Sequence, residues 1–215
     1  ENTRGSYPIE RIPNSSSTGI CGHPDNIIFL TCDAFGVLPP VTLLSNDEAI
    51  EIFYKTGYLH NHMRMYIAAV CCNIGKYHWS APANWMYANL LDGDLASNQL
   101  SWQWVAGSFY NKKYYANQDN INTFFKSSQK NTFLDLDYDA FSQLQTPQVL
   151  TETIAFDLQT TLPDVEQQRL QQNKTTLIYN YYNMDPYWHK GEDLQRVLLL
   201  EPSVFNKNPV SQKCI

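Results

Sequence analysis

The sequence predicts a mainly α protein, in which a helical bundle follows a short segment of α/β type and precedes two C-terminal strands. Between residues 45 and 107, four successive stretches place apolar side chains at helical spacing, between residues that start or stop helices. Of the 215 residues, 43% are hydrophobic, which is enough to build a packed core. Two runs rich in β-branched and aromatic residues, 175–182 and 196–202, predict the strands.

The N-terminal part changes character near residue 45. Residues 1–25 are rich in turn-forming residues, and the run NIIFLTCDAF (26–35) predicts a buried strand. Ser45 followed by Glu48 fits a capping box, so we expect a helix to begin there and to stop at Gly57.

Three further helices are predicted in order. The second spans about 59–74, and the third spans 82–91 with Pro82 in its first turn. The fourth begins after Asp94, a good N-cap, and ends at about Gly107.

Residues 108–148 are polar and predict a long loop with short helical turns. Alternating aspartates begin at Asp135, but a calcium loop needs glycine at its sixth position and an acid at its twelfth. Ala140 and Thr146 occupy those positions, so we predict no metal site.

The chain therefore divides into three predicted parts: 1–44, 45–148 and 149–215. The Gln-rich stretch 149–173 predicts a helix and a linker before the strands.

Composition limits the partners. The net charge of −6 argues against a strongly basic nucleic-acid surface, although a local lysine patch remains open (Lys112, Lys113, Lys126 and Lys130). No apolar run approaches the roughly 18 residues of a membrane span, so no membrane partner is expected. The five cysteines form no CxxC pair, which favours reduced structural thiols and a cytoplasmic location.

A dense group of polar and aromatic residues lies between positions 58 and 107. On the second helix the cation Arg64 shares a face with a polar side chain, and on the fourth a polar face ends in a tryptophan. The group comprises Asn61, Arg64, Asp92, Asp94, Asn98 and Trp102. A buried charge must be paired, so Arg64 is expected to meet Asp92 in a buried ion pair. Two interpretations stay open: a site for a planar redox heterocycle, or a helical bundle with one core salt bridge and aromatic packing.

From about Asp47 to the end, the chain resembles the photolyase/cryptochrome family, in the C-terminal half of its helical FAD-binding domain. The resemblance rests on TGYLHNHMRMY, on Trp79 in KYHW, and on LLDGDLASNQLSWQWVAG. It implies FAD as cofactor and light-driven electron transfer, with repair of pyrimidine dimers in damaged DNA (a lyase reaction) or light sensing as the outcome.

The resemblance also implies roles for single residues. Asn61 and Arg64 would lie against the flavin, Asp92 and Asp94 would contact its ribityl and adenine portions, and Asn98 would face N5. Three tryptophans complete the implied set: the electron donor nearest the flavin, the middle donor, and a side chain near the opening for a flipped base (Trp102, Trp79 and Trp104).

Two departures from the family weaken the implied recognition of the dimer. His62 follows the asparagine of HN, where the repair branch usually carries a basic residue. Leu100-Ser101 stands where two glycines often precede the WQW motif.

Residues 1 to about 44 resemble a different family, ATP-dependent phosphoenolpyruvate carboxykinase. ENTRGSYPIERIPN and HPDNIIFLTCDAFGVLPPV carry the resemblance, which implies that Arg4 contacts nucleotide phosphate and substrate. The sequence contains no GxxxxGK[ST] loop to hold phosphates.

Together these resemblances predict a chimera or fragment, with its seam between Val41 and Glu48. Both parts are expected to be incomplete, since the photolyase antenna domain and the upstream half of the FAD pocket are not in the sequence. The leading hypothesis is a flavin-binding, photolyase-like protein of impaired function. The alternatives are a carboxykinase fragment, which would be a carboxy-lyase, and a non-catalytic helical module.

Overall fold

The computed structural model describes residues 26–27, 46–151, 154–164 and 169–215. These residues are mostly helical, which confirms the mainly α prediction. Of the predicted N-terminal segment, only residues 26–27 belong to the described residues. The rest of the predicted 26–35 strand lies outside them.

The chain separates into two compact units. The first ends at Asp157 and the second begins at Leu158, with Cys214 grouped with the first unit. The three-part division expected from the sequence stays a prediction.

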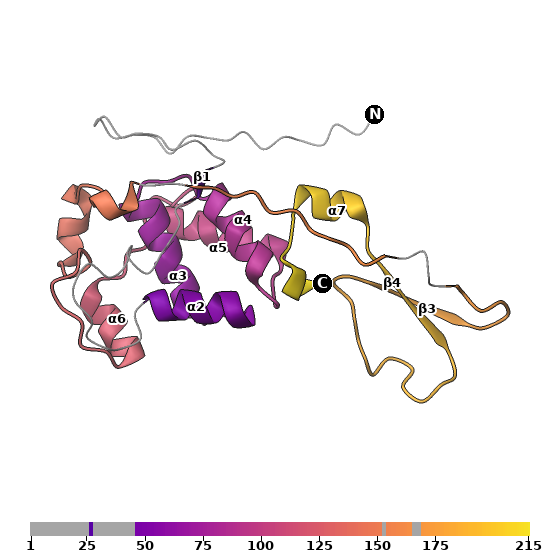
Figure 1. Cartoon of the computed structure of the whole chain (residues 1–215). Helices are drawn as coiled ribbons and strands as arrows, with labels where there is room; N and C mark the ends of the chain where they lie inside the picture. Colours follow the sequence, from indigo (N-terminus) through magenta and orange to yellow (C-terminus); the bar gives the residue numbers. More distant parts are fainter. Residues whose placement is uncertain (1–25, 28–45, 152–153, 165–168) are drawn as a thin grey trace. The chain divides into compact units, whose positions relative to one another are not determined.

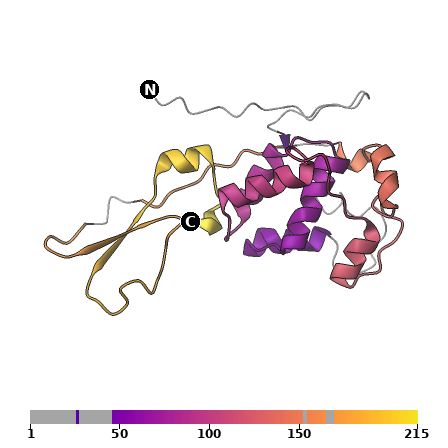
Figure 2. The ribbon, with the colours of Figure 1, turned by 180° about the vertical axis from the view of Figure 1, so that it is seen from behind.

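Helices make up most of the first unit (Figures 1 and 2). They are α2 (Asn46–Thr56), α3 (Asn61–Ala69), the π-helical turn η1 (Val70–Ile74), α4 (Ser80–Asn89), α5 (Leu95–Ala106) and α6 (Gln118–Phe125). Helix α5 packs against both α3 and α4, and α2 packs against α3. The four helices predicted between residues 45 and 107 are therefore present.

Local signals set the ends of these helices. Asp94 is the N-cap of α5, and its side chain accepts a hydrogen bond from the Ser97 amide at 2.8 Å. Gly107 ends α5, and Gly57 follows α2; both have φ of +70°, which favours glycine.

The predicted helix 59–74 is in fact two different elements. After α3, the backbone widens into η1, where the Gly75 amide donates to the Val70 carbonyl at 2.8 Å, five residues back. Cys71 and Cys72 lie on this turn and are buried, as expected for structural thiols. The apolar pattern alone could not distinguish the two windings, because both bury the same side chains.

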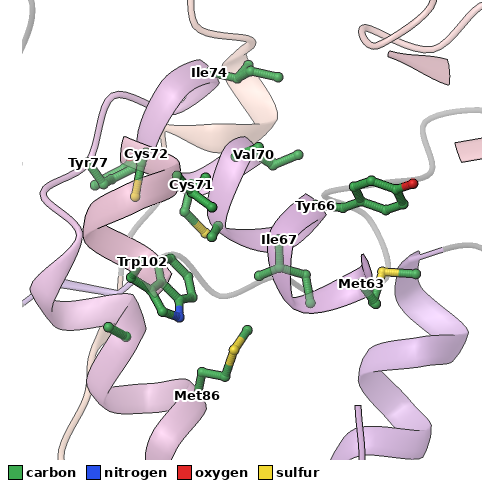
Figure 3. Close-up of a cluster of buried hydrophobic side chains, with 14 of the residues drawn as sticks. Met63, Tyr66, Ile67, Val70, Cys71, Cys72, Ile74, Tyr77, Met86 and Trp102 are labelled. Atoms are coloured by element: carbon green, nitrogen blue, oxygen red, sulfur yellow. The ribbon is translucent and has the colours of Figure 1, made fainter. Parts of the chain in front are cut away.

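The core of the first unit lies between α3, η1, α4 and α5. Figure 3 shows Trp102 entering it from α5, with Cys71 on one side and Met86 near the indole nitrogen. All three side chains are buried. This core also forms one wall of the cavity described below.

The segment after α5 is more ordered than the predicted loop. It contains α6 and two 3-10 turns, η2 (Tyr138–Gln143) and η3 (Gln148–Leu150). Asn117 caps α6 by accepting from the Asn120 amide at 3.0 Å.

The predicted helix within 149–173 was wrong for the part of it that the structure describes. Apart from the last residues of η3, that part contains the short strand β2 (Ile154–Ala155), which pairs antiparallel with β1 (Asn26–Ile27). The pairing is non-local, so the sequence of the stretch alone could not reveal it.

The second unit contains the two predicted strands. β3 (Thr176–Asn180) and β4 (Gln195–Leu199) pair in parallel, with Thr176 opposite Gln195. Helix α7 (Pro202–Lys207) and the turn η4 (Gln212–Cys214) follow.

Candidate functional site

A cavity of about 580 Å³ opens beside α3, α4 and α5. Its volume lies in the range of small-molecule and cofactor sites. Most of the predicted site residues line it: Asn61, Arg64, Asp92, Asp94, Asn98, Trp102 and Trp104. The sequence missed much of the apolar lining, which includes Met65, Ala68, Met86, Leu90, Val105 and Phe109.

The predicted Arg64–Asp92 ion pair borders this cavity. Nη2 of Arg64 lies 2.9 Å from both carboxylate oxygens of Asp92, and its Nε donates to the Leu59 carbonyl at 2.8 Å. The pair is not buried as expected, because the Asp92 side chain is 59% exposed. Asp92 lies in the turn between α4 and α5, where solvent reaches it.

Gly57 connects the two sides of this ion pair. Its carbonyl accepts a hydrogen bond from the Leu91 amide at 2.9 Å, next to Asp92. A Cβ atom at Gly57 would lie 2.7 Å from Cγ of Leu91 and 3.1 Å from the Asn89 carbonyl oxygen. The sequence identified Gly57 only as a helix stop, because its second role depends on a contact 34 residues away.

Asp94 contributes a second carboxylate to the cavity wall. The hydrogen bonds from Ser97, first from its backbone amide, lower the pKa of Asp94. This side chain is exposed to solvent and is ionised at neutral pH.

Asn98 is buried, and of its side-chain amide only the nitrogen makes a hydrogen bond among the described residues. Its Nδ2 donates to the Ala83 carbonyl on α4 at 2.8 Å. Its Oδ1 accepts no hydrogen bond among the described residues, and Asn98 lines the cavity. A hydrogen-bond donor on a bound ligand could therefore bind to Oδ1.

The two cavity tryptophans differ in exposure. Trp102 is only 1% exposed, and its Nε1 is a buried donor without a hydrogen-bond partner among the described residues. Trp104 is 45% exposed, and its ring lies 5.8 Å from that of Tyr114. Trp102 thus belongs to the inner wall and Trp104 to the open side.

Of the predicted residues that the structure describes, Trp79 is not brought to the cavity. Trp79 packs against the core, lies 5.3 Å from the His78 ring, and does not line the cavity. Arg4 lies outside the described residues.

His62, one of the departures, stacks between other rings. The His60 ring lies 5.3 Å away, and the Phe124 ring lies 4.1 Å away. Its buried Nδ1 has no hydrogen-bond partner among the described residues.

These features fit a planar heteroaromatic ligand. The wall is mainly apolar and aromatic, and Asn98 adds an amide oxygen that accepts no hydrogen bond among the described residues. An apolar wall with a few polar groups is typical of a site for a small ligand.

The comparison with known families agrees with this geometry. Residues 47–138 match the family model of the FAD binding domain of DNA photolyase. This range contains every residue that lines the cavity.

A second family model, phosphoenolpyruvate carboxykinase, matches residues 1–63. Two unrelated models thus match one chain, as expected for a chimera or fragment, and their ranges overlap at 47–63. In the structure this overlap contains α2, whose Tyr54 accepts a hydrogen bond from Nε1 of Trp85 at 2.7 Å. The overlap therefore packs as part of the helical unit.

Curated relatives of the N-terminal part are carboxykinases. Phosphoenolpyruvate carboxykinase (ATP) of Geobacter metallireducens is 60% identical over 58 residues, which is 27% of this chain and 11% of the relative. The Salinibacter ruber enzyme is likewise 60% identical, with the same coverage of both chains. The chain thus spans about one tenth of the length of these relatives, and no solved structure matches it.

The described residues contain no group of three or more His, Cys, Asp or Glu side chains placed to hold a metal ion. Within the same residues, no helix has the length and apolar character needed to cross a membrane.

Proposed function

We propose that residues 47–138 form a flavin site of the photolyase/cryptochrome type. The observation that carries the proposal is the cavity lined by Asn98 and Trp102, which has a mainly apolar and aromatic wall and lies inside the range that matches the FAD-binding family.

Each residue has a task in this proposal. FAD, when bound, supplies light absorption and single-electron transfer. Asn98 accepts a hydrogen bond from the ring through Oδ1, while Ala83 holds its amide in place. Trp102 is the electron donor at the cavity wall, and Trp79 is the next electron donor. The Arg64–Asp92 pair keeps one side of the cavity polar.

The open side suits a damaged base in DNA. Trp104 and Phe109 line the cavity and are 45% and 59% exposed, so they offer aromatic faces at its mouth. Repair of a pyrimidine dimer is the outcome that this open side suits, and light sensing is the alternative outcome of the same electron transfer. The free thiols at Cys71 and Cys72 support a cytoplasmic location.

The test is flavin binding by the purified full-length chain. We expect a yellow protein that holds about one flavin per chain and quenches its fluorescence. Trp102→Phe should relieve part of the quenching, whereas Trp188→Phe in the second unit should not. A colourless protein that takes up no added flavin would contradict the proposal.

A second candidate function is that of ATP-dependent phosphoenolpyruvate carboxykinase. It rests on the 60% identity over 58 residues and on Arg4. The 215 residues contain no GxxxxGK[ST] loop to bind nucleotide phosphates. The identity of the N-terminal part therefore indicates common ancestry with the carboxykinases and not their activity. Assay of the full chain with oxaloacetate, ATP and Mn²⁺ tests it, and we expect no turnover.

A further inference from the structure

The charges around the cavity point to a ligand without phosphate. We infer that the cavity takes the uncharged isoalloxazine and ribityl part of a flavin, and that the phosphate groups of FMN or FAD gain no affinity from it. This inference rests on the proposed flavin site and specifies which part of the cofactor the site recognises.

Among the described residues, the lining contains one cation and two carboxylates. The cation is Arg64, and Asp92 already neutralises it through contacts of 2.9 Å from Nη2 to both carboxylate oxygens. The Leu59 carbonyl occupies Nε as well. Arg64 is therefore already committed to groups of the protein, and a phosphate would have to compete with Asp92 for it.

The helix terminus at the cavity is also occupied. The N-terminus of a helix commonly binds phosphate through its free amides and its dipole. At α5, however, the Asp94 carboxylate accepts from the Ser97 amide at 2.8 Å and takes the place that an anion would occupy. Asp94 is ionised, since these hydrogen bonds lower its pKa, and no cation in the described lining neutralises it.

The remaining lining suits an uncharged ligand. Apolar and aromatic side chains such as Leu90, Trp102 and Phe109 fit a planar ring system. Neutral polar groups at Asn98 and Ser101 fit ring heteroatoms, and carboxylates accept hydrogen bonds from the hydroxyls of a ribityl chain.

The experiment compares three flavins with the same full-length protein. Riboflavin, FMN and FAD are titrated separately, and flavin fluorescence anisotropy gives the dissociation constants. We expect FAD and riboflavin to agree within about threefold, since each 1.4 kcal/mol of real contact would give tenfold. FMN should bind no more tightly than riboflavin, and lowering the salt concentration should weaken FMN relative to riboflavin because screening falls.

A pair of variants identifies the charge responsible. Asp94→Asn removes the charge but keeps a good N-cap, so it should raise the affinity for FMN relative to riboflavin by about threefold. Asp119→Asn is the matched control, since Asp119 also lies in the first turn of a helix, α6, but does not line the cavity. It should leave the ratio of the two constants unchanged.

The outcomes separate the two proposals. If FAD binds more than about threefold tighter than riboflavin, then the phosphates or the adenosine are recognised and the inference is wrong. Tighter binding of FMN than of riboflavin would overturn it equally. If none of the three flavins binds, the flavin site itself is refuted and the inference falls with it.

Discussion

Gly57 is the residue on which the geometry of the ion pair most depends. Its carbonyl holds the Leu91 amide, and two residues later the Leu59 carbonyl holds Nε of Arg64. The Arg64–Asp92 bond closes a ring of contacts between the corner after α2 and the turn after α4. A side chain at Gly57 would push these two segments apart.

Replacing Gly57 by alanine should lower stability. The variant forces φ of +70° on alanine and brings Cβ to 2.7 Å from Cγ of Leu91, so we expect a loss of about 1–3 kcal/mol in the free energy of unfolding. Urea denaturation measures it. Gly191→Ala is the control, with φ of +90° and no atom within 4 Å of the added Cβ. Equal losses in the two variants would show that backbone strain, not the contact with Leu91, is responsible.

Asp94 should make stability depend on pH. Its folded pKa is lowered by the amide of Ser97, so its contribution is present above the unfolded pKa of about 3.9 and is lost as pH falls through the folded value. Urea unfolding of the wild type and of Asp94→Asn should therefore show the largest difference near neutral pH. That difference should shrink towards zero on acidification below the unfolded pKa. A gap that stays constant on acidification would mean that the carboxylate charge is not involved.

At the scale of elements, the π-helical turn η1 joins the end of α5 to the chain that follows it. Its Asn73 is buried, and Nδ2 donates to the Val105 carbonyl at 2.9 Å and to the Tyr114 carbonyl at 2.7 Å. One amide thus ties the end of α5 to the chain that returns from the loop after it. The wide turn places this residue where an α-helix would rotate it away.

Asn73→Ala should cost more stability than a comparable change on the next helix. It removes one buried and one partly buried hydrogen bond and leaves two carbonyls without that donor, for an expected loss of about 2–3 kcal/mol. Asn89→Ala is the comparison, because Asn89 is also buried but donates once, to the Trp85 carbonyl at 2.9 Å. Chemical denaturation of both variants measures the two losses in the free energy of unfolding. A smaller loss for Asn73→Ala than for Asn89→Ala would show that the two hydrogen bonds of Asn73 do not stabilise the unit in this way.

At the scale of the molecule, family matches and compact units divide the chain at different places. The two matches overlap at 47–63, and the photolyase-type match ends at 138, whereas the first unit continues to Asp157. Helix α2, most of which both family models match, packs against α3 in the first unit. The boundary between the two compact units therefore follows the packing of the helices and not the ends of the family matches.

Limited trypsin digestion should cut the described part first after Arg169. Arg169 and Leu170 are exposed and belong to no helix or strand, whereas the nearby Lys174 pairs with Asp193. Mass spectrometry should detect an early fragment that begins at Leu170, and Arg169→Gln should abolish it. An earlier cut after Lys55, within α2, would instead place the least stable region in the helical unit.

The sequence by itself determined both ends of α5, the end of α2, and the charged, amide and tryptophan side chains of the cavity wall. Asp94 and Gly107 act through bonds to their own neighbours, and fixed steps along a helix put Asn98 and Trp102 on one face. Such signals are local, so they can be recognised without knowing the fold. The likeness to the FAD-binding family came from the same stretch.

Only the tertiary structure decided how these faces combine. The exposure of the Arg64–Asp92 pair, the second role of Gly57 and the clamp of Asn73 all depend on residues far away in the chain. The winding of η1 and the β1–β2 pairing were also hidden, because burial patterns do not specify which backbone bonds form. Non-local contacts are chosen by packing, and packing depends on the whole unit rather than on any one stretch.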